Sequence, residues 1–350
     1  MLQNDLSLLL ITYNRRQKLQ ETLNAILSNN SPVKNCSITI LDNCSTDGTS
    51  EMIEQFITTH PNIRHIRHPL NIGGNANICR AFEMGACSGK AYFWVLCDDD
   101  KYDFSNWAEV TKAMEAQKDI ICCADYIFPS AQDKTDPAYQ IFQLTFVPAG
   151  IYKSSLLTGD TLINMYDAIS VMFPQSCVAI QAINTHKTIH ALSKPIVFNG
   201  LHFPDKVDSA SLSYKRGNES WRMDRIDNMR WILGFSNILS LVKDKTIQEK
   251  CMAVAIPYKD IYGNWENFYN CVGNLYLNPT DFNYFLEIYK MLPSTARSRF
   301  KSNFSLKIKP PKFDSGKLHL SEYVFSVRNE GRHKVLRILG IKITFRRKKI

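Results

Sequence analysis

Long apolar runs are absent from this 350-residue sequence. None approaches the roughly 18 residues of a membrane-spanning helix, and short stretches such as Ala91 to Cys97 are the longest. The early apolar stretch Leu6 to Ile11 follows Asp5 and precedes Arg15 and Arg16, which is the wrong polarity for a secretory signal. We therefore expect no membrane-spanning helix and a cytoplasmic location.

Several signatures of cofactor and metal sites are also missing. No GxGxxG motif follows the first apolar run, which argues against a dinucleotide-binding fingerprint. The sequence also has no GxxxxGK[ST] motif, which argues against a P-loop. The ten cysteines show no CxxC spacing, so we expect reduced core residues. His186 and His190 would share one helical face, but no Cys or further His nearby completes a metal set. An ordinary helix surface is the better interpretation.

Negative charge is scarce at one end of the chain. Residues 297–350 carry 16 Lys or Arg against 3 Asp or Glu, whereas the rest carries 26 against 30. The mixture of apolar and basic residues from His333 to Ile350 fits a segment lying on an anionic membrane surface. The alternation of Ile341 and Ile343 after Gly340 equally fits a small hairpin packed on the body. No RNA- or DNA-binding motif accompanies the tail, so no nucleic acid partner is expected.

With 45% hydrophobic residues, the chain is long enough to bury a sizeable core. Its first hundred residues alternate short apolar runs with apolar residues at helical spacing. The predicted strands are Leu6–Ile11, Ser37–Leu41, Ile63–Ile66 and Ala91–Cys97, with one helix after each of the first three. Repeated strand–helix units of this size predict parallel strands joined by right-handed crossovers, hence an open α/β sheet.

Beyond residue 104 the pattern is less regular. Trp107, Val110 and Met114 predict a helix, and Asp119 to Ile127 predicts a strand. Further helical patterns cover Gln175–Leu192, Trp221–Leu241, Ala253–Tyr276 and Phe282–Met291.

In open α/β sheets, ligands bind beyond the carboxyl ends of the strands, and here those positions are polar. Asp42 is placed to accept hydrogen bonds from a base or ribose, with helix capping as the alternative. Gly73 and Gly74 would let backbone approach a diphosphate, or would simply make a turn. The residues after the four strands are Thr12, Tyr13, Asn14 and Arg15; Asp42 to Gly48; Asn71 to Gly74; and Asp98, Asp99 and Asp100.

Three consecutive carboxylates repel one another, so we expect a cation or hydrogen-bond donors beside them. If the extended path continues, Asp98 and Asp100 point the same way and Asp99 points oppositely. An oxygen-only pair suits Mg²⁺ or Mn²⁺ bound mainly through substrate phosphates. A solvated acidic loop is the alternative. The position beside three other polar strand ends favours the metal interpretation.

Taken together, the four strand ends resemble the nucleotide-sugar-binding half of the inverting family-2 glycosyltransferases of GT-A fold. The motifs that carry the resemblance are, in order, Ile11-Thr12-Tyr13-Asn14-Arg15, Asp42 to Thr49, Asn71 to Asn77, and Asp98-Asp99-Asp100 in the place of an Asp-x-Asp motif. The resemblance implies a catalytic domain over residues 1–215, with a donor half at 1–103 and an acceptor half at 104–215. A helical region at 216–306 and a basic segment at 307–350 would follow.

The resemblance also implies an activity and its cofactor. A metal-dependent inverting glycosyltransferase would move a sugar from a nucleotide sugar, with a UDP-sugar as the leading choice, to a hydroxyl of a lipid-linked or surface-glycan acceptor. Thr12, Tyr13 and Asp42 would line the base and ribose pocket, and Asp98 would lie near the ribose or the metal. Asp100 would coordinate Mn²⁺ or Mg²⁺. Asn14, Arg15, Asn71, Gly73, Gly74 and Asp99 complete the expected donor site.

The catalytic base is where the resemblance thins. The family often carries Glu-Asp at the start of a helix, and this chain has no clear copy. Asp167 is the first choice and Asp160 the second, with a helix-start carboxylate as the alternative role for either. His202 resembles a late histidine that some GT-A enzymes present to the metal, with a satisfied loop histidine as the alternative.

Other readings of the same features remain open. Arg230 and Trp231 match the last two letters of a processive synthase motif, but Asp227 replaces its Gln, so transfer of one sugar or few is expected.

A sugar nucleotidyltransferase would normally show glycines after the first strand, and Thr12 to Arg16 has none. A catalytically inactive membrane-bound module is the non-enzymatic alternative. A peripheral position on the inner face of the cytoplasmic membrane and a homo-oligomer through Trp221–Met291 are also open.

Overall fold

The computed structural model describes residues 5–124, 133–170, 172–198, 234–258, 325–330, 333–338 and 341–346. The chain divides into two compact units, Met1–Arg297 and Ser298–Ile350, and each is described by itself. The predicted internal boundaries of the first unit stay predictions.

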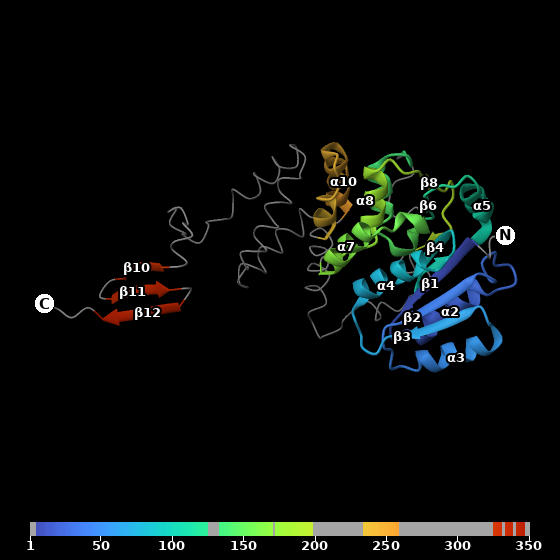
Figure 1. Ribbon diagram of the computed structural model, residues 1–350, viewed down its shortest axis with the longest axis horizontal. Coiled ribbons are helices and arrows are strands. Elements are labelled where there is room, and N and C mark those ends of the chain that lie inside the picture. Colours follow the sequence, from blue (N-terminus) through green and yellow to red (C-terminus); the bar gives the residue numbers. More distant parts are fainter. Residues whose placement is uncertain are drawn as a thin grey trace. The chain divides into compact units, whose positions relative to one another are not determined.

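A seven-stranded sheet forms the centre of the first unit, in the order β3-β2-β1-β4-β7-β6-β8 (Figure 1). Its strands are β1 (Leu6–Thr12), β2 (Ser37–Asp42), β3 (Ile63–Arg67), β4 (Tyr92–Cys97), β6 (Ile120–Cys122), β7 (Gly150–Lys153) and β8 (Ile189–Ala191). Every neighbouring pair is parallel except those of β7, which runs antiparallel to both β4 and β6. The predicted α/β class with a mostly parallel central sheet is confirmed.

Helices follow the strands as the periodicity predicts. In α2, Leu19, Leu23 and Ile26 recur at helical spacing and are buried, because one stripe of the helix faces the sheet. The helices are α2 (Arg16–Ile26), α3 (Thr49–Thr59), α4 (Gly74–Ala86), α5 (Trp107–Glu115), α6 (Pro137–Gln143), α7 (Gly159–Asp167), α8 (Ser176–Asn184) and α10 (Lys245–Tyr258). Among the described residues, no helix has both the length and the apolar character needed to cross a bilayer.

Short elements complete the described part of this unit. They are the two-stranded sheet of β5 (Lys101–Tyr102) and β9 (Val197–Phe198), a helical segment at residues 234–239, and the 3-10 turns η1 (Phe104–Asn106), η2 (Val147–Ala149), η3 (Ser154–Leu156) and η4 (Ala168–Ser170).

The core lies around β1 and β4, the central strands. Leu8, Leu10 and Trp94 are completely buried, as expected for parallel strands covered on both faces. The Trp94 indole N–H donates to the Pro148 carbonyl at 2.8 Å, so its polar atom is satisfied inside the core. Because β1, β2 and β4 are parallel and adjacent, the polar residues that follow them emerge at the same edge of the sheet.

The region after β7 departs from the sequence-based prediction. Helix α8 ends at Asn184, and β8 follows, so His186 and His190 do not share a helical face. His190 instead lies 3.1 Å from Glu109 of α5. The backbone of β8 pairs with β6, whose residues are distant in sequence. This pairing stabilises a strand where the local sequence pattern favours a helix only weakly.

Two further boundaries differ from the prediction. The strand expected from Asp119 to Ile127 is limited to Ile120–Cys122, and residues 125–132 lie outside the described part. Helix α10 begins at Lys245, ahead of the predicted start at Ala253. The predicted helix Phe282–Met291 and most of Trp221–Leu241 also lie outside the described residues.

The cysteine prediction holds for most of the described chain. Cys36, Cys79, Cys122, Cys123, Cys177 and Cys251 are buried free thiols. Cys44 and Cys97 are partly exposed and Cys87 is exposed, so these three are not core residues.

The described part of the second unit is a three-stranded antiparallel sheet of β10 (Phe325–Glu330), β11 (His333–Ile338) and β12 (Ile341–Arg346). The hairpin predicted from the alternating apolar residues after Gly340 is confirmed as the β11–β12 pair. Strand β10 adds a third member that the sequence pattern did not reveal.

Replacement of Gly85 tests the packing of α4 on the sheet. A Cβ atom at this position would lie 2.5 Å from the ring of the buried Phe93 of β4, which is too close for any carbon contact. We expect Gly85→Ala to lower the free energy of unfolding by about 1–3 kcal/mol, measured by urea denaturation. Gly159→Ala, where the added atom meets nothing within 4 Å, is the control and should change stability by less than about 0.5 kcal/mol. Equal stability of both variants would contradict the close packing of α4 on β4.

Candidate functional site

The carboxyl ends of β1, β2 and β4 bring the predicted polar residues together. Thr12 pairs with Asp42 across β1 and β2, and Ile11 pairs with Cys97 across β1 and β4. Asp98, the next residue, therefore lies beside Thr12, whose Oγ1 donates to Asp98 Oδ2 at 2.7 Å. Sequence positions 86 residues apart meet here because parallel register aligns the strand ends.

Arg15 supplies the positive charge that the three carboxylates require. Its Nη1 lies 2.9 Å from Asp98 Oδ1 and 2.7 Å from Asp99 Oδ2. Burial raises the pKa of Asp98 to about 6, against the lowering effects of Arg15 and of the Thr12 hydroxyl. The guanidinium thus holds together an acidic turn in which Asp98 is only 2% exposed.

The predicted alternation of these carboxylates is wrong. Strand β4 ends at Cys97, and Asp98 and Asp99 form a turn, so the extended path does not continue. One guanidinium nitrogen contacts both Asp98 and Asp99, which therefore do not point to opposite sides. The turn is held further by Thr22 of α2, whose hydroxyl donates to the Asp98 carbonyl at 3.0 Å. Asp100 follows it and is buried.

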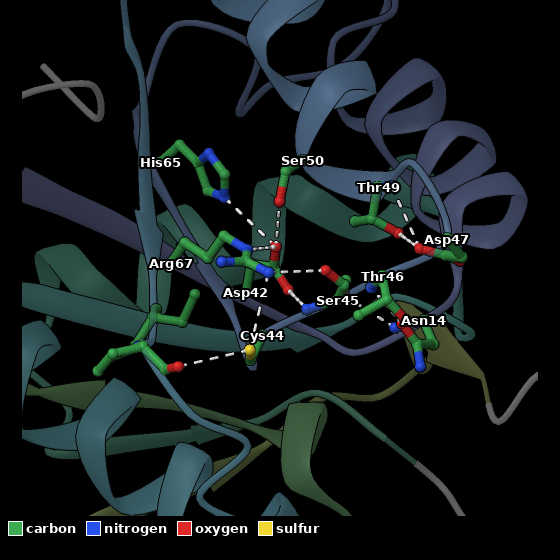
Figure 2. Close-up of polar contacts among 12 residues, drawn as sticks. Asn14, Asp42, Cys44, Ser45, Thr46, Asp47, Thr49, Ser50, His65 and Arg67 are labelled. Carbon is green, nitrogen blue, oxygen red and sulfur yellow. Dashed lines mark hydrogen bonds and ion pairs between the residues drawn. The ribbon is translucent and has the colours of Figure 1, made fainter.

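Asp42 at the end of β2 is completely buried within a cluster of donors (Figure 2). Its Oδ1 accepts from the Ser45 backbone N–H at 2.8 Å, and its Oδ2 accepts from the Ser50 hydroxyl at 2.6 Å. His65 Nε2 and Arg67 Nε, both from β3, each lie 3.7 Å from Oδ2. Burial by itself would raise the pKa of Asp42, but its interactions with His65, Ser45 and Ser50 hold that pKa well below the ordinary value.

His65 lies between two carboxylates. Its Nδ1 is 2.9 Å from Glu54 Oε1 of α3, and its Nε2 faces Asp42. Burial alone would lower the pKa of His65, but Asp42 and Glu54 together raise it above the ordinary value. A charged imidazole is thereby favoured beside Asp42.

Asn14 ties the loop after β1 to the loop after β2. Its backbone N–H donates to Ser45 Oγ at 2.9 Å, and its Oδ1 accepts from the Thr46 N–H at 2.7 Å (Figure 2). Asn14 adopts a φ of 49°, a left-handed conformation that Asn tolerates better than most residues. Asp47, two residues before the first residue of α3, accepts from the Arg16 backbone N–H at 3.1 Å and from the Thr49 N–H at 3.2 Å. Asn14 and Asp47 therefore hold these two loops together.

The loop before α4 is fixed in a similar way. The Asn43 amide donates to Asn71 Oδ1 at 2.8 Å, and Asn43 Oδ1 accepts from the Ile72 N–H at 2.9 Å. Asn71 Oδ1 also accepts from the Gly73 N–H. Gly73 has a φ of 85°, which favours glycine, and Gly74 begins α4. The predicted turn is present, and it presents backbone at the N-terminus of a helix.

Three side chains at this edge keep a large exposed fraction. These are Tyr13 at 43%, Arg15 at 41% and Arg67 at 43%. The sequence-based search missed Arg67 and its neighbour His65. The signal was present in the sequence of β3, Ile63-Arg64-His65-Ile66-Arg67, which places basic residues next to an acidic strand end.

The two candidate bases lie at opposite ends of α7. Asp160 is in the first turn, which Thr158 caps, whereas Asp167 is the last residue. The alternative role of Asp167, a helix-start carboxylate, is therefore wrong. Asp167 lies two residues before Ile169, whose carbonyl accepts from Asn75 in the first turn of α4 at 2.8 Å. Of the two candidates, Asp167 is thus the one tied to the loop containing Gly73 and Gly74.

Helix α8 has no acidic residue in its first turn. The residue before it is Gln175, which is buried and donates its amide to the Thr145 carbonyl at 2.7 Å. His202 and the segment Asp227–Trp231 lie outside the described residues.

The acidic turn has donor chemistry suited to a divalent ion. In the described part of the chain, no three His, Cys, Asp or Glu side chains form a group that would hold a metal by themselves. Mg²⁺ in nucleotide sites typically uses one or two carboxylates and takes its other ligands from phosphates and water. Asp98, Asp99 and Asp100 fit that limited role.

Comparison with known proteins gives consistent matches. Residues 7–181, half of the chain, match the family described as glycosyl transferase family 2. Over 113 residues the chain is 31% identical to abequosyltransferase RfbV of Salmonella typhimurium. That stretch is 32% of this chain and 33% of the relative, so the match spans about a third of the relative's length.

Two solved structures are similar at low identity. One is a mannosyltransferase from Pyrobaculum calidifontis in complex with GDP-Man and Mn²⁺, with 12% identity, 87% of this chain and 81% of that chain covered, and a TM-score of 0.49. The other is S. aureus TarS 1–349 in complex with UDP-GlcNAc, with 13% identity, coverage of 74% and 91%, and a TM-score of 0.43.

Substitution of His65 tests the electrostatic cluster around Asp42. The folded-state pKa of His65 lies above 6.5, so its charge stabilises the fold fully below that pH, and this stabilisation is lost as pH rises through the raised pKa. The pKa of Asp42 lies below 3.8, so its own contribution is lost only on acidification. His65→Gln should therefore reduce the free energy of unfolding more at about pH 6 than at about pH 9, measured by urea denaturation.

The matched control is His186→Gln, at an exposed turn position after α8. This control removes an imidazole that lies outside the cluster of His65, Asp42 and Glu54. An equal loss for His65→Gln at pH 6 and pH 9 would show that the imidazole charge does not stabilise the cluster.

Proposed function

The chain belongs to glycosyl transferase family 2. From this premise we propose that it is a glycosyltransferase that moves a single sugar from a nucleotide sugar to a hydroxyl group of a glycan or lipid-linked acceptor. The observation that carries this proposal is the meeting of Thr12, Arg15, Asp42 and Asp98 at one edge of the parallel sheet. That edge is where open α/β sheets bind their ligands.

The donor site follows from the chemistry of the residues at this edge. Tyr13 is exposed there and offers an aromatic face for a base. The carboxylate of Asp42 is held in place by hydrogen bonds from Ser45 and Ser50 and by ion pairs with His65 and Arg67. Gly74 is the first residue of α4, and the backbone N–H groups at the N-terminus of a helix favour a phosphate group. The N–H of Gly73 donates to Asn71 Oδ1 and holds the turn before the helix. A UDP-sugar is our leading choice of donor.

Asp100, with Asp98 or Asp99, is proposed to hold Mn²⁺ or Mg²⁺ together with the donor's phosphates. When bound, such an ion neutralises negative charge that develops on the departing nucleoside diphosphate. His202 remains a proposed further ligand.

The transfer itself requires a base for the acceptor hydroxyl. The hydroxyl oxygen attacks the anomeric carbon from the side opposite the phosphate, so the bond from that carbon to the phosphate oxygen breaks and its electron pair leaves with the nucleoside diphosphate. A carboxylate takes the hydroxyl proton, and the configuration at the anomeric carbon is inverted.

Asp167 is the better candidate for that base. An acidic residue in the first turn of a helix is stabilised by the helix dipole, which accounts for Asp160 without any catalytic role. An acidic residue at the last position of a helix gains no such stabilisation, so Asp167 has no comparable structural reason to be there. Its end of α7 is also the end that Asn75 joins to the donor-binding loop.

The acceptor and the location stay proposals. The relative's name, abequosyltransferase, supports transfer of one sugar in the assembly of a surface polysaccharide or lipopolysaccharide. A cytoplasmic enzyme working on a lipid-linked acceptor would gain from the basic tail if the tail binds anionic lipid at the inner face of the membrane.

Product analysis tests the proposed activity and its metal dependence. The protein is incubated with UDP-, GDP-, CDP- and dTDP-sugars and a panel of hydroxyl-bearing glycan acceptors in the presence of Mn²⁺ or EDTA, and the released nucleotide is identified. We expect release of a nucleoside diphosphate that depends on the metal and is lost in Asp100→Ala, while the thermal unfolding of that variant stays cooperative. Formation of a nucleoside triphosphate and a sugar 1-phosphate after addition of inorganic pyrophosphate would indicate a nucleotidyltransferase, and binding without turnover would indicate an inactive module.

Parallel substitution of the two candidate bases tests the proton transfer. We expect Asp167→Asn to lower kcat by about 10²–10⁴-fold with little change in KM for the donor, because a base acts only as the reaction proceeds. Asp160→Asn is the matched control from the same helix and should keep kcat near that of the unmodified protein. The reverse result would transfer the role to Asp160, and normal kcat in both would exclude α7 as its source.

A further inference from the structure

Both oxygens of Asp98 have partners within the chain. Oδ2 accepts from Thr12, and Oδ1 is paired with Arg15, which also contacts Asp99. A divalent cation that approached Asp98 and Asp99 from the exposed side would meet the Arg15 guanidinium at the same oxygens. The two cations repel each other, so they cannot share these carboxylates without a loss of affinity.

The acidic partner is held rigidly, whereas Arg15 is not. Asp98 is 2% exposed and is anchored by side chains from β1 and α2 at both its carboxylate and its carbonyl. The Arg15 side chain is 41% exposed. It occupies the cap position of α2 but makes no side-chain capping bond there. Any rearrangement of this ion pair therefore moves the guanidinium and leaves the carboxylate in place.

Arg15 also has donors to offer elsewhere. Within the described residues its side-chain contacts all run through Nη1, so Nη2 and Nε remain available. Burial by itself would lower the pKa of Arg15, but Asp98 and Asp99 raise it above its ordinary value, so the guanidinium stays charged. A planar guanidinium with adjacent N–H groups matches the oxygens of a phosphate group, which it binds by paired hydrogen bonds.

We propose that Arg15 is an exchangeable counter-ion: in the free protein it neutralises Asp98 and Asp99, and on donor binding it turns to the diphosphate and leaves these carboxylates to the metal. This proposal rests on the proposed function of the same site. It names the residue that stabilises the departing nucleoside diphosphate and explains how the acidic turn stays folded before any ligand arrives.

If Arg15 exchanges in this way, its replacement should strengthen binding of the metal and weaken binding of the nucleotide. Removing the guanidinium eliminates a competitor for the carboxylates, so the metal alone should bind more tightly. The same change removes charge-assisted hydrogen bonds to the diphosphate, so the nucleotide should bind more weakly. A residue that merely supported the fold would weaken both events when it is replaced.

The experiment compares Arg15→Gln with Arg16→Gln by titration calorimetry on the full chain. Arg16 is the next residue and is exposed, so its replacement makes the same change of charge without touching the acidic turn. We expect Arg15→Gln to bind Mn²⁺ alone about 3- to 10-fold more tightly than Arg16→Gln. UDP, GDP, CDP and dTDP are then each titrated at saturating Mn²⁺. The diphosphate that binds the unmodified protein should bind Arg15→Gln about 10- to 100-fold more weakly than it binds Arg16→Gln.

The corresponding nucleoside, which has no phosphates, should bind both variants equally. Arg15→Lys keeps the charge but not the paired donors, so it should restore the weak Mn²⁺ binding and only part of the diphosphate affinity. Equal Mn²⁺ affinity in Arg15→Gln and Arg16→Gln, undetectable binding in both included, would overturn the proposal, as would equal diphosphate affinity. Failure of every nucleoside diphosphate to bind the unmodified protein would instead refute the proposed function.

Discussion

The free-energy cost of burying carboxylates at the ends of parallel strands governs this site. Asp42 and Asp98 are almost completely enclosed, and an isolated charge in such a place would be strongly destabilising. Each is compensated by basic side chains from a neighbouring element. Arg15 follows the adjacent strand β1, while His65 and Arg67 belong to the adjacent strand β3. The order of the strands in the sheet therefore determines which basic side chains compensate each buried carboxylate.

Because that compensation comes from the chain's own side chains, this edge of the sheet is organised by internal contacts. Asn14 joins the first two loops, and Asn43 joins the second loop to the third. The close approach of Gly85 to Phe93 sets α4 against β4, and so sets the position of the glycines at the start of that helix. Binding energy is then not spent on ordering loops, which is the general benefit of preorganisation.

Residues 1–103 and the residues that follow differ in how far local sequence predicts their structure. In the first hundred residues, β1, β2 and β4 are six or seven residues long, and the helices carry buried residues at helical spacing. Strands, helices and polar strand ends can therefore be predicted in order. In the residues that follow, β6, β7 and β8 are only three or four residues long and pair with strands distant in sequence. Patterns this short do not distinguish a strand from a helix, which is why the segment containing His190 was predicted wrongly.

The sequence by itself determined the α/β class, the order of the four polar strand ends, and the need for a cation beside Asp98, Asp99 and Asp100, because hydrophobic period and like-charge repulsion are local properties. Only the tertiary structure decided which cation that is. Arg15 and Asp98 are 83 residues apart, and the parallel register of β1 and β4 brings them to 2.9 Å. The same holds for His65 and Arg67 around Asp42, and for the attachment of the end of α7 to the first turn of α4. The physical reason is that such contacts depend on strand pairing and helix packing, which no spacing along the chain encodes.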